Sequence, residues 1–242
     1  MLTAIGWRGG SKAAPRAWER YAWAAGVVFV LALVAEVAIS VGIPVDQNSS
    51  AAKIAGELDK HRDRLLAIAC LSIVYAVAFV IYLWRLYDLL RGSRDRRPPL
   101  SSLVLVGGIL FVTLHAVSDI GIVGMLGAKL ASYSAQRDQG VAYTLYLTTF
   151  ALDSVGDVFG SLFAFAAGVL VIRSGVLPRW LGWMLIAVGI LFFLQGFGLG
   201  GVIYVFGLVL DLIAFVLFLI FVLASGVILL RRVAPTTATR LG

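Results

Sequence analysis

Residues 202–230, VIYVFGLVLDLIAFVLFLIFVLASGVILL, decide the fold class of this chain. The stretch contains one charged side chain, Asp211, and it ends at the paired cations Arg231 and Arg232. A helix needs about 20 apolar residues to cross a hydrocarbon layer of about 30 Å, so this stretch is long enough to span a bilayer. Its apolar residues are continuous rather than alternating, which favours a helix over a barrel strand.

The same pattern recurs along the rest of the chain. Hydrophobic residues make up 61% of the 242 residues and charged residues 14%, and the mean hydropathy is +0.97. A soluble domain carries about 25% charged residues. We therefore predict an all-α, polytopic transmembrane helical bundle with about six helices and little chain outside the lipid. The predicted helices cover residues 21–43, 65–90, 101–127, 142–172, 180–196 and 202–230.

Basic residues predict the orientation of the bundle. Most of the 20 lysines and arginines lie in the first 20 residues, in the turns at 85–97 and 173–179, and after residue 230. Cytoplasmic segments carry such an excess, so we expect both termini to be cytoplasmic. The domains are then a basic cytoplasmic arm (1–20), a transmembrane domain (21–232) and a cytoplasmic tail (233–242). The net charge of +7 reflects topology, and no nucleic-acid partner is indicated.

Two local predictions concern the ends of the helices. Tryptophan and tyrosine favour the membrane interface, and six of them lie near the predicted cytoplasmic helix ends. The segment 45–64 between the first two helices is polar and contains residues of the types that begin helices, Asp46, Asn48 and Ser49. We therefore expect one of these residues to cap a helix that leads into the next span. The predicted interface belt consists of Tyr21, Trp23, Trp84, Tyr87, Trp180 and Trp183.

The stretch beginning at residue 173, RSGVLPRWLGWMLIAVG, resembles the signature of a large family of small bacterial membrane proteins with a domain of unknown function. The resemblance implies six helices and a location in a bacterial plasma membrane, and it carries no activity and no catalytic residues. It rests on Ser174, Gly175, Leu177, Pro178, Arg179, Leu181, Gly182 and Gly189.

The same residues also have a structural interpretation. Gly175 can adopt a positive φ and end a helix, and Pro178 suits the start of the next one. Arg173 and Arg179 would hold the turn at the cytoplasmic headgroups. Gly182 and its neighbour seven residues on, Gly189, lie on one helix face and allow close packing.

Ionisable side chains inside the predicted spans are the candidate functional residues. Such groups are costly in lipid and usually face a polar interior. Four carboxyl groups lie roughly 10–17 Å below the outer helix ends, judged from a rise of about 1.5 Å per residue. Two further groups lie one turn deeper, each four residues from one of the four. The outer four are Glu36, Asp119, Asp153 and Asp211, and the deeper two are His115 and Asp157.

The spacing of these residues predicts one polar pocket. His115 and Asp119 lie on one face of the 101–127 helix, and Asp153 and Asp157 lie on one face of the 142–172 helix. These helices are consecutive and antiparallel, so their faces can meet. We expect a carboxylate-rich pocket in the outer half of the bundle that binds or transports a small solute, a cation or a proton.

Other interpretations stay open at this point. The polar groups could only pair with one another to fix helix packing, in a non-enzymatic accessory or lipid-binding protein with partner subunits or as a homo-oligomer. One histidine with carboxylates could also bind a divalent metal, which gives an intramembrane metalloenzyme as a third candidate.

The single cysteine, Cys70, excludes an intrachain disulfide. No phosphate loop or nucleophile elbow is present, so an enzyme is disfavoured and any cofactor stays unknown.

Overall fold

The computed structural model describes residues 14–44, 48–92, 98–127, 139–196 and 204–233, and all regular structure in these ranges is helical. The predicted all-α transmembrane bundle is confirmed. Helices long and apolar enough to cross a membrane cover Trp18–Ser40, Arg62–Gly92, Leu100–Val123, Gln139–Ser174 and Leu212–Arg232. A further apolar helix, Arg179–Leu194, is shorter, so the count of six spans stays a prediction.

The helices begin and end close to the predicted positions. The main elements are α1 (Ala14–Ser40), α3 (Arg62–Gly92), α4 (Pro98–Ala116), α7 (Gln139–Ser174), α8 (Arg179–Leu194) and α10 (Tyr204–Val233). The chain continues from α4 into a π-helical segment, η1 (Val117–Val123), and a last turn, α5 (Gly124–Gly127). Helix α1 includes part of the predicted N-terminal arm, and the rest of the arm lies outside the described residues.

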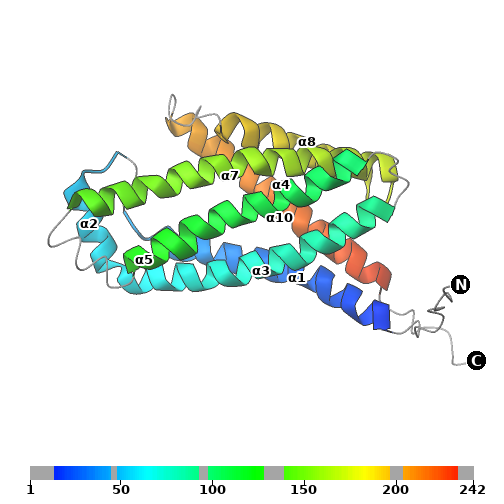
Figure 1. Ribbon diagram of the computed structural model, residues 1–242, viewed down its shortest axis with the longest axis horizontal. Helices are drawn as coiled ribbons and strands as arrows, with labels where there is room; N and C mark the ends of the chain where they lie inside the picture. Colours follow the sequence, from blue (N-terminus) through cyan, green and yellow to red (C-terminus); the bar gives the residue numbers. More distant parts are fainter. Residues whose placement is uncertain (1–13, 45–47, 93–97, 128–138, 197–203, 234–242) are drawn as a thin grey trace, which may run out of the picture.

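These helices form a closed ring in chain order. Each one contacts the next, from α1 through α3, α4, α7 and α8 to α10, and α10 returns to α1. Figure 1 shows that the start of α1 and the end of α10 lie at the same end of the bundle. We refer to this end, which the charges predict to be cytoplasmic, as the inner end. The opposite end, where α2 (Ala51–Lys60) lies, is the outer end.

Helix α2 is separate from α3 rather than continuous with it. Its cap is Ser50, whose Oγ accepts a hydrogen bond of 3.3 Å from the backbone N–H of Lys53. The prediction of Asn48 or Ser49 as the cap is therefore wrong, and Asp46 lies outside the described residues. The segment between the first two spans thus forms its own amphipathic helix.

The buried face of α2 packs onto the outer end of the ring. It contacts α3, α5 and α7, where apolar side chains form a small buried group with partly buried neighbours that include Ile43 and Tyr146. We call this group the outer cluster. Its buried members are Ile54, Leu58, Leu65 and Leu126.

Helices α7 and α8 approach each other through small residues. A Cβ built on Gly182 would lie 2.9 Å from the carbonyl oxygen of Gly168, and one on Gly189 would lie 3.2 Å from that of Ser161. The predicted close packing through these two glycines is present, and it continues outward where Gly196 meets Ser154. Because these contacts involve backbone carbonyls, they leave no room for larger side chains.

The turn between α7 and α8 also has the expected geometry. Gly175 has a φ of +64°, and its N–H donates to the carbonyl oxygen of Val171 at 3.2 Å. Pro178 caps α8, and Arg232 of α10 donates a hydrogen bond of 2.6 Å to the carbonyl of Val176. This arginine therefore ties the last helix to the turn.

The predicted aromatic belt is only partly present. Tyr21, Trp84, Trp180 and Trp183 are each more than half exposed at the inner end. Trp23 is 2% exposed, so its placement in the belt was wrong. It faces the interior of the ring and packs edge-on against Tyr82 with ring centroids 6.0 Å apart.

Candidate functional site

Three carboxylates from three different helices meet in the outer half of the bundle. Glu36 comes from α1, Asp119 from η1 and Asp153 from α7. Glu36 interacts electrostatically with both aspartates, and Asp119 interacts with Asp153. We call these residues the carboxylate cluster. The structure therefore brings together side chains that lie more than 30 residues apart in the sequence.

Helix α3 completes the carboxylate cluster with hydroxyl groups. The Tyr75 hydroxyl donates a hydrogen bond of 2.7 Å to Oδ2 of Asp119. The side chain of Ser72 interacts with both Glu36 and Asp119. Sequence reasoning missed both residues because it searched for charges, and the middle of this helix has none. Their spacing of three residues, which places two polar groups on one face of an apolar helix, is the signal that could have found them.

The π-helical segment η1 positions Asp119. The N–H of Gly124 donates to the carbonyl oxygen of Asp119, five residues earlier, which is the hydrogen-bond pattern of a π-helix. Single π-turns inside α-helices widen the backbone and occur frequently at functional sites. In the continuous stretch from α4 through η1 to α5, this widened turn contains Asp119, which accepts the hydrogen bond from Tyr75. The same turn also contacts α7.

Glu36 is the most enclosed carboxylate of the cluster. Its side chain is 9% exposed, and among the described residues Oε2 has no hydrogen-bond partner. The hydroxyl of Ser118, which is fully buried next to Asp119, also has none. An ionised carboxylate in apolar surroundings is costly unless it is paired. Among the described residues, the charged groups that act on Glu36 are Asp119 and Asp153. Both are acidic, so neither offsets the cost of a charge on Glu36.

One turn deeper lies the second polar group, the His115–Asp157 pair. Nε2 of His115 on α4 is 3.7 Å from Oδ1 of Asp157 on α7. Nδ1 of His115 is 2.9 Å from the carbonyl oxygen of Phe111. Asp157 is 5% exposed. The imidazole also interacts electrostatically with Asp119, so the pair and the carboxylate cluster form one polar region.

A small cavity adjoins this polar region. It has a volume of about 80 Å³ and its polar lining comes from Tyr75, His115 and Asp157. A single water molecule occupies about 30 Å³ of the liquid, so the cavity has room for a few waters. Its remaining lining is apolar, mostly from phenylalanines, and consists of Phe29, Leu33, Phe111, Val112, Phe192, Phe215 and Phe218.

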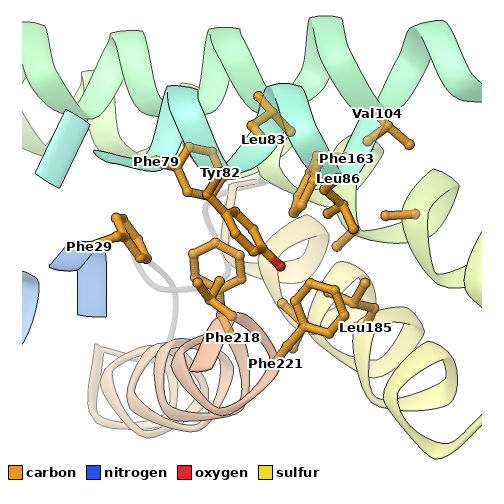
Figure 2. Close-up of a cluster of buried hydrophobic side chains, with 14 of the residues drawn as sticks. Phe29, Phe79, Tyr82, Leu83, Leu86, Val104, Phe163, Leu185, Phe218 and Phe221 are labelled. Atoms are coloured by element: carbon orange, nitrogen blue, oxygen red, sulfur yellow. The ribbon is translucent and has the colours of Figure 1, made fainter. Parts of the chain in front are cut away.

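Apolar side chains close the polar region on its inner side. Phe29 lies about two turns inward of Glu36 on α1, and Phe79 lies about two turns inward of Ser72 on α3. Their rings are 5.0 Å apart, and Phe79 also packs on Phe218 of α10 at 5.9 Å. Figure 2 shows these rings gathered between the helices. We call this group the aromatic seal, which consists of Phe29, Phe79, Phe111, Phe163, Phe192 and Phe218.

The outer cluster closes the other side. Leu65 lies about two turns outward of Ser72, and Leu126 lies about two turns outward of Asp119. Polar side chains therefore occupy a layer of the bundle with apolar groups above and below it.

Asp211 belongs to α10, but its side chain lies outside what the structure describes, so its predicted place in the pocket is not observed. Within the described ranges, no group of three or more His, Cys, Asp or Glu residues is arranged to hold a metal ion.

Comparison with known proteins places the chain in a family. A family model described as a domain of unknown function, DUF4386, matches residues 24–232, which is most of the chain. No curated protein and no solved structure matches the chain significantly. The predicted resemblance to a family of uncharacterised proteins is thus confirmed.

Proposed function

The chain belongs to the DUF4386 family, and we propose that it is a proton-binding transport protein of a bacterial plasma membrane. In this proposal the carboxylate cluster binds and releases protons that arrive from the outer side.

The observation that carries the proposal is the convergence of Glu36, Asp119 and Asp153 around a buried, unpartnered oxygen of Glu36. Like charges that act on one another disfavour full ionisation, and burial adds to this penalty. A proton on one or more of the carboxyl groups removes part of the negative charge and supplies a donor. A proton is therefore the ligand that best suits the charge of the carboxylate cluster.

The size of the neighbouring cavity supports a small ligand. About 80 Å³ accommodates a few water molecules, whereas pockets for organic ligands measure about 300–1,000 Å³. Water next to carboxyl groups and a histidine provides the medium through which protons move in membrane proteins.

The apolar layers on both sides support transport rather than simple buffering. In this proposal the apolar side chains of the outer cluster and of the aromatic seal flank a proton in the carboxylate cluster on its two sides. Rearrangement of one layer at a time would expose the site to one side and then to the other.

The test uses Asp119→Asn and Asp153→Asn in purified protein reconstituted into vesicles with a pH gradient. We expect both variants to fold with near wild-type thermal stability and to lose proton flux, measured with a pH-sensitive dye inside the vesicles. The control is Asp59→Asn, which changes an exposed carboxylate on α2 and should keep full flux. Wild-type flux in both cluster variants would refute the proposal.

A second candidate is a non-enzymatic packing role in an accessory protein. The 2.7 Å hydrogen bond between Tyr75 and Asp119 favours it, because such a bond between helices also stabilises a bundle. This role predicts a sharp loss of thermal stability in Asp119→Asn and no proton flux in the wild-type protein.

A further inference from the structure

We infer that the His115–Asp157 pair is a second proton-binding station, and that Nε2 of His115 is the atom that accepts the proton. The transfer between the two stations rests on the proposed function, whereas the protonation of His115 can be measured without it.

The hydrogen bonding of His115 identifies the accepting atom. A carbonyl oxygen can only accept, so the contact of 2.9 Å to Phe111 means that Nδ1 carries the hydrogen. In the neutral imidazole Nε2 then keeps its lone pair. It faces Oδ1 of Asp157 at 3.7 Å, which is longer than a hydrogen bond and leaves space for movement when a proton arrives.

The packing around the imidazole holds it in this orientation. A Cβ built on Gly156 of α7 would lie 2.6 Å from both Cε1 and Nδ1 of His115, so only a glycine leaves room for the ring here. The ring also packs on Phe111 with centroids 4.6 Å apart. The backbone of α4 and the glycine of α7 therefore fix the direction in which Nε2 points.

Acidic groups from two neighbouring elements lie close to the ring of His115. Asp119 on η1 and Asp157 on α7 each act on it directly. Beyond Asp119 lie Glu36 on α1 and Asp153 on α7, and α3 contributes the neutral Tyr75. The cavity lining from α8 and α10 consists of phenylalanines.

The transfer step moves one proton from Asp119 to His115. The O–H bond of a protonated Asp119 breaks, and in our proposal an intervening water passes the proton to the lone pair of Nε2, where an N–H bond forms. Asp119 becomes a carboxylate that keeps the hydrogen bond from Tyr75, and the imidazolium is paired with the carboxylate of Asp157. The proton has then moved one turn inward and lies next to the aromatic seal.

The chain offers a direct test, because it contains only two histidines, His61 and His115. Protein labelled with ¹⁵N-histidine in lipid nanodiscs gives two sets of imidazole signals, and His61→Gln identifies those of His115. We expect His115 to carry its hydrogen on Nδ1 at alkaline pH and to gain one on Nε2 as the pH falls. Asp157→Asn removes the counter-charge, so the doubly protonated signal should be lost over the same pH range.

Proton flux in vesicles provides the second measurement. We expect His115→Gln and Asp157→Asn each to lower the flux about 100-fold, the size of effect typical of a proton-transferring group. His61→Gln is the matched control and should keep wild-type flux.

The ¹⁵N signals and the proton flux together distinguish a protonated His115 from proton transport. A hydrogen on Nε2 with a bare Nδ1 at alkaline pH, or wild-type flux in His115→Gln, would overturn the station. Wild-type protein without flux, in which His115 still gains a proton on Nε2, would refute transport and support the station.

Discussion

The hydroxyl of Tyr75 on α3 lies 2.7 Å from Oδ2 of Asp119, in the π-helical segment that continues α4. This bond joins the uncharged middle of α3 to the carboxylate cluster, and it supplies Asp119 with a donor that lies on another helix.

Tyr75→Phe removes this donor and keeps the ring. We expect the free energy of unfolding to fall by about 1–3 kcal/mol, because a buried acceptor that loses its partner is costly. Denaturant unfolding in detergent micelles measures the change. Tyr87→Phe, at a partly exposed inner position, is the control and should change stability much less. Equal losses in the two variants would show that the bond to Asp119 contributes little.

Glu36→Gln distinguishes a functional carboxylate from a structural one. The amide is neutral and similar in shape, so it removes a like charge from the carboxylate cluster. We expect the free energy of unfolding to stay the same or rise by up to about 1 kcal/mol while proton flux is lost. Infrared difference spectra should also lose one protonated-carboxyl band. A large loss of stability with wild-type flux would instead make Glu36 a packing residue.

Gly182→Ala tests the close contact between α7 and α8. A Cβ at this position would lie 2.9 Å from the carbonyl oxygen of Gly168, so the two backbones must separate. We expect a loss of about 1–3 kcal/mol, measured by thermal or denaturant unfolding. Gly56→Ala in α2 is a matched control with no atom within 4 Å of the new Cβ, and it should stabilise by about 0.5–1 kcal/mol.

Gly156→Ala tests the position of the imidazole. The added methyl group would overlap the ring of His115, so we expect the ring to turn away and the bond to the carbonyl of Phe111 to break. The ¹⁵N signals of His115 report this change directly. In Gly121→Ala, where the nearest atom lies 3.9 Å from the new Cβ, those signals should stay as in the wild type. Unchanged signals in Gly156→Ala would mean that the glycine is not what fixes the ring.

Apolar length and charge placement were sufficient to predict the helices of the bundle. They also predicted that Glu36, His115, Asp119, Asp153 and Asp157 would lie near one another, because a lipid environment leaves such groups few places other than the interior. The predictions were incomplete or wrong where contacts between helices determine which side chains are buried and which residues join the site. Tyr75 and Ser72 have no charge to mark them, and the side of the helix on which Trp23 is buried depends on how α1 packs in the ring.

A helix was expected between the first two spans, but not that α2 would be separate from α3, and the π-helical segment was not predicted. The ten residues of α2 are only weakly apolar, so hydropathy alone gave no reason to place them on the bundle. The 101–127 stretch was predicted as one regular helix, because nothing in its composition marks the wider turn at Val117–Val123.

That wider turn makes the polar layer depend on the number of residues in the chain as well as on their identity. One residue corresponds to about 100° of rotation around a helix axis. Deleting a single residue other than Asp119 between Val117 and Val123 would keep every acidic side chain in the sequence, yet it would change how α5 and the outer part of this helix are rotated relative to α4. Insertions and deletions in this short window would therefore change the protein more than many substitutions elsewhere in it.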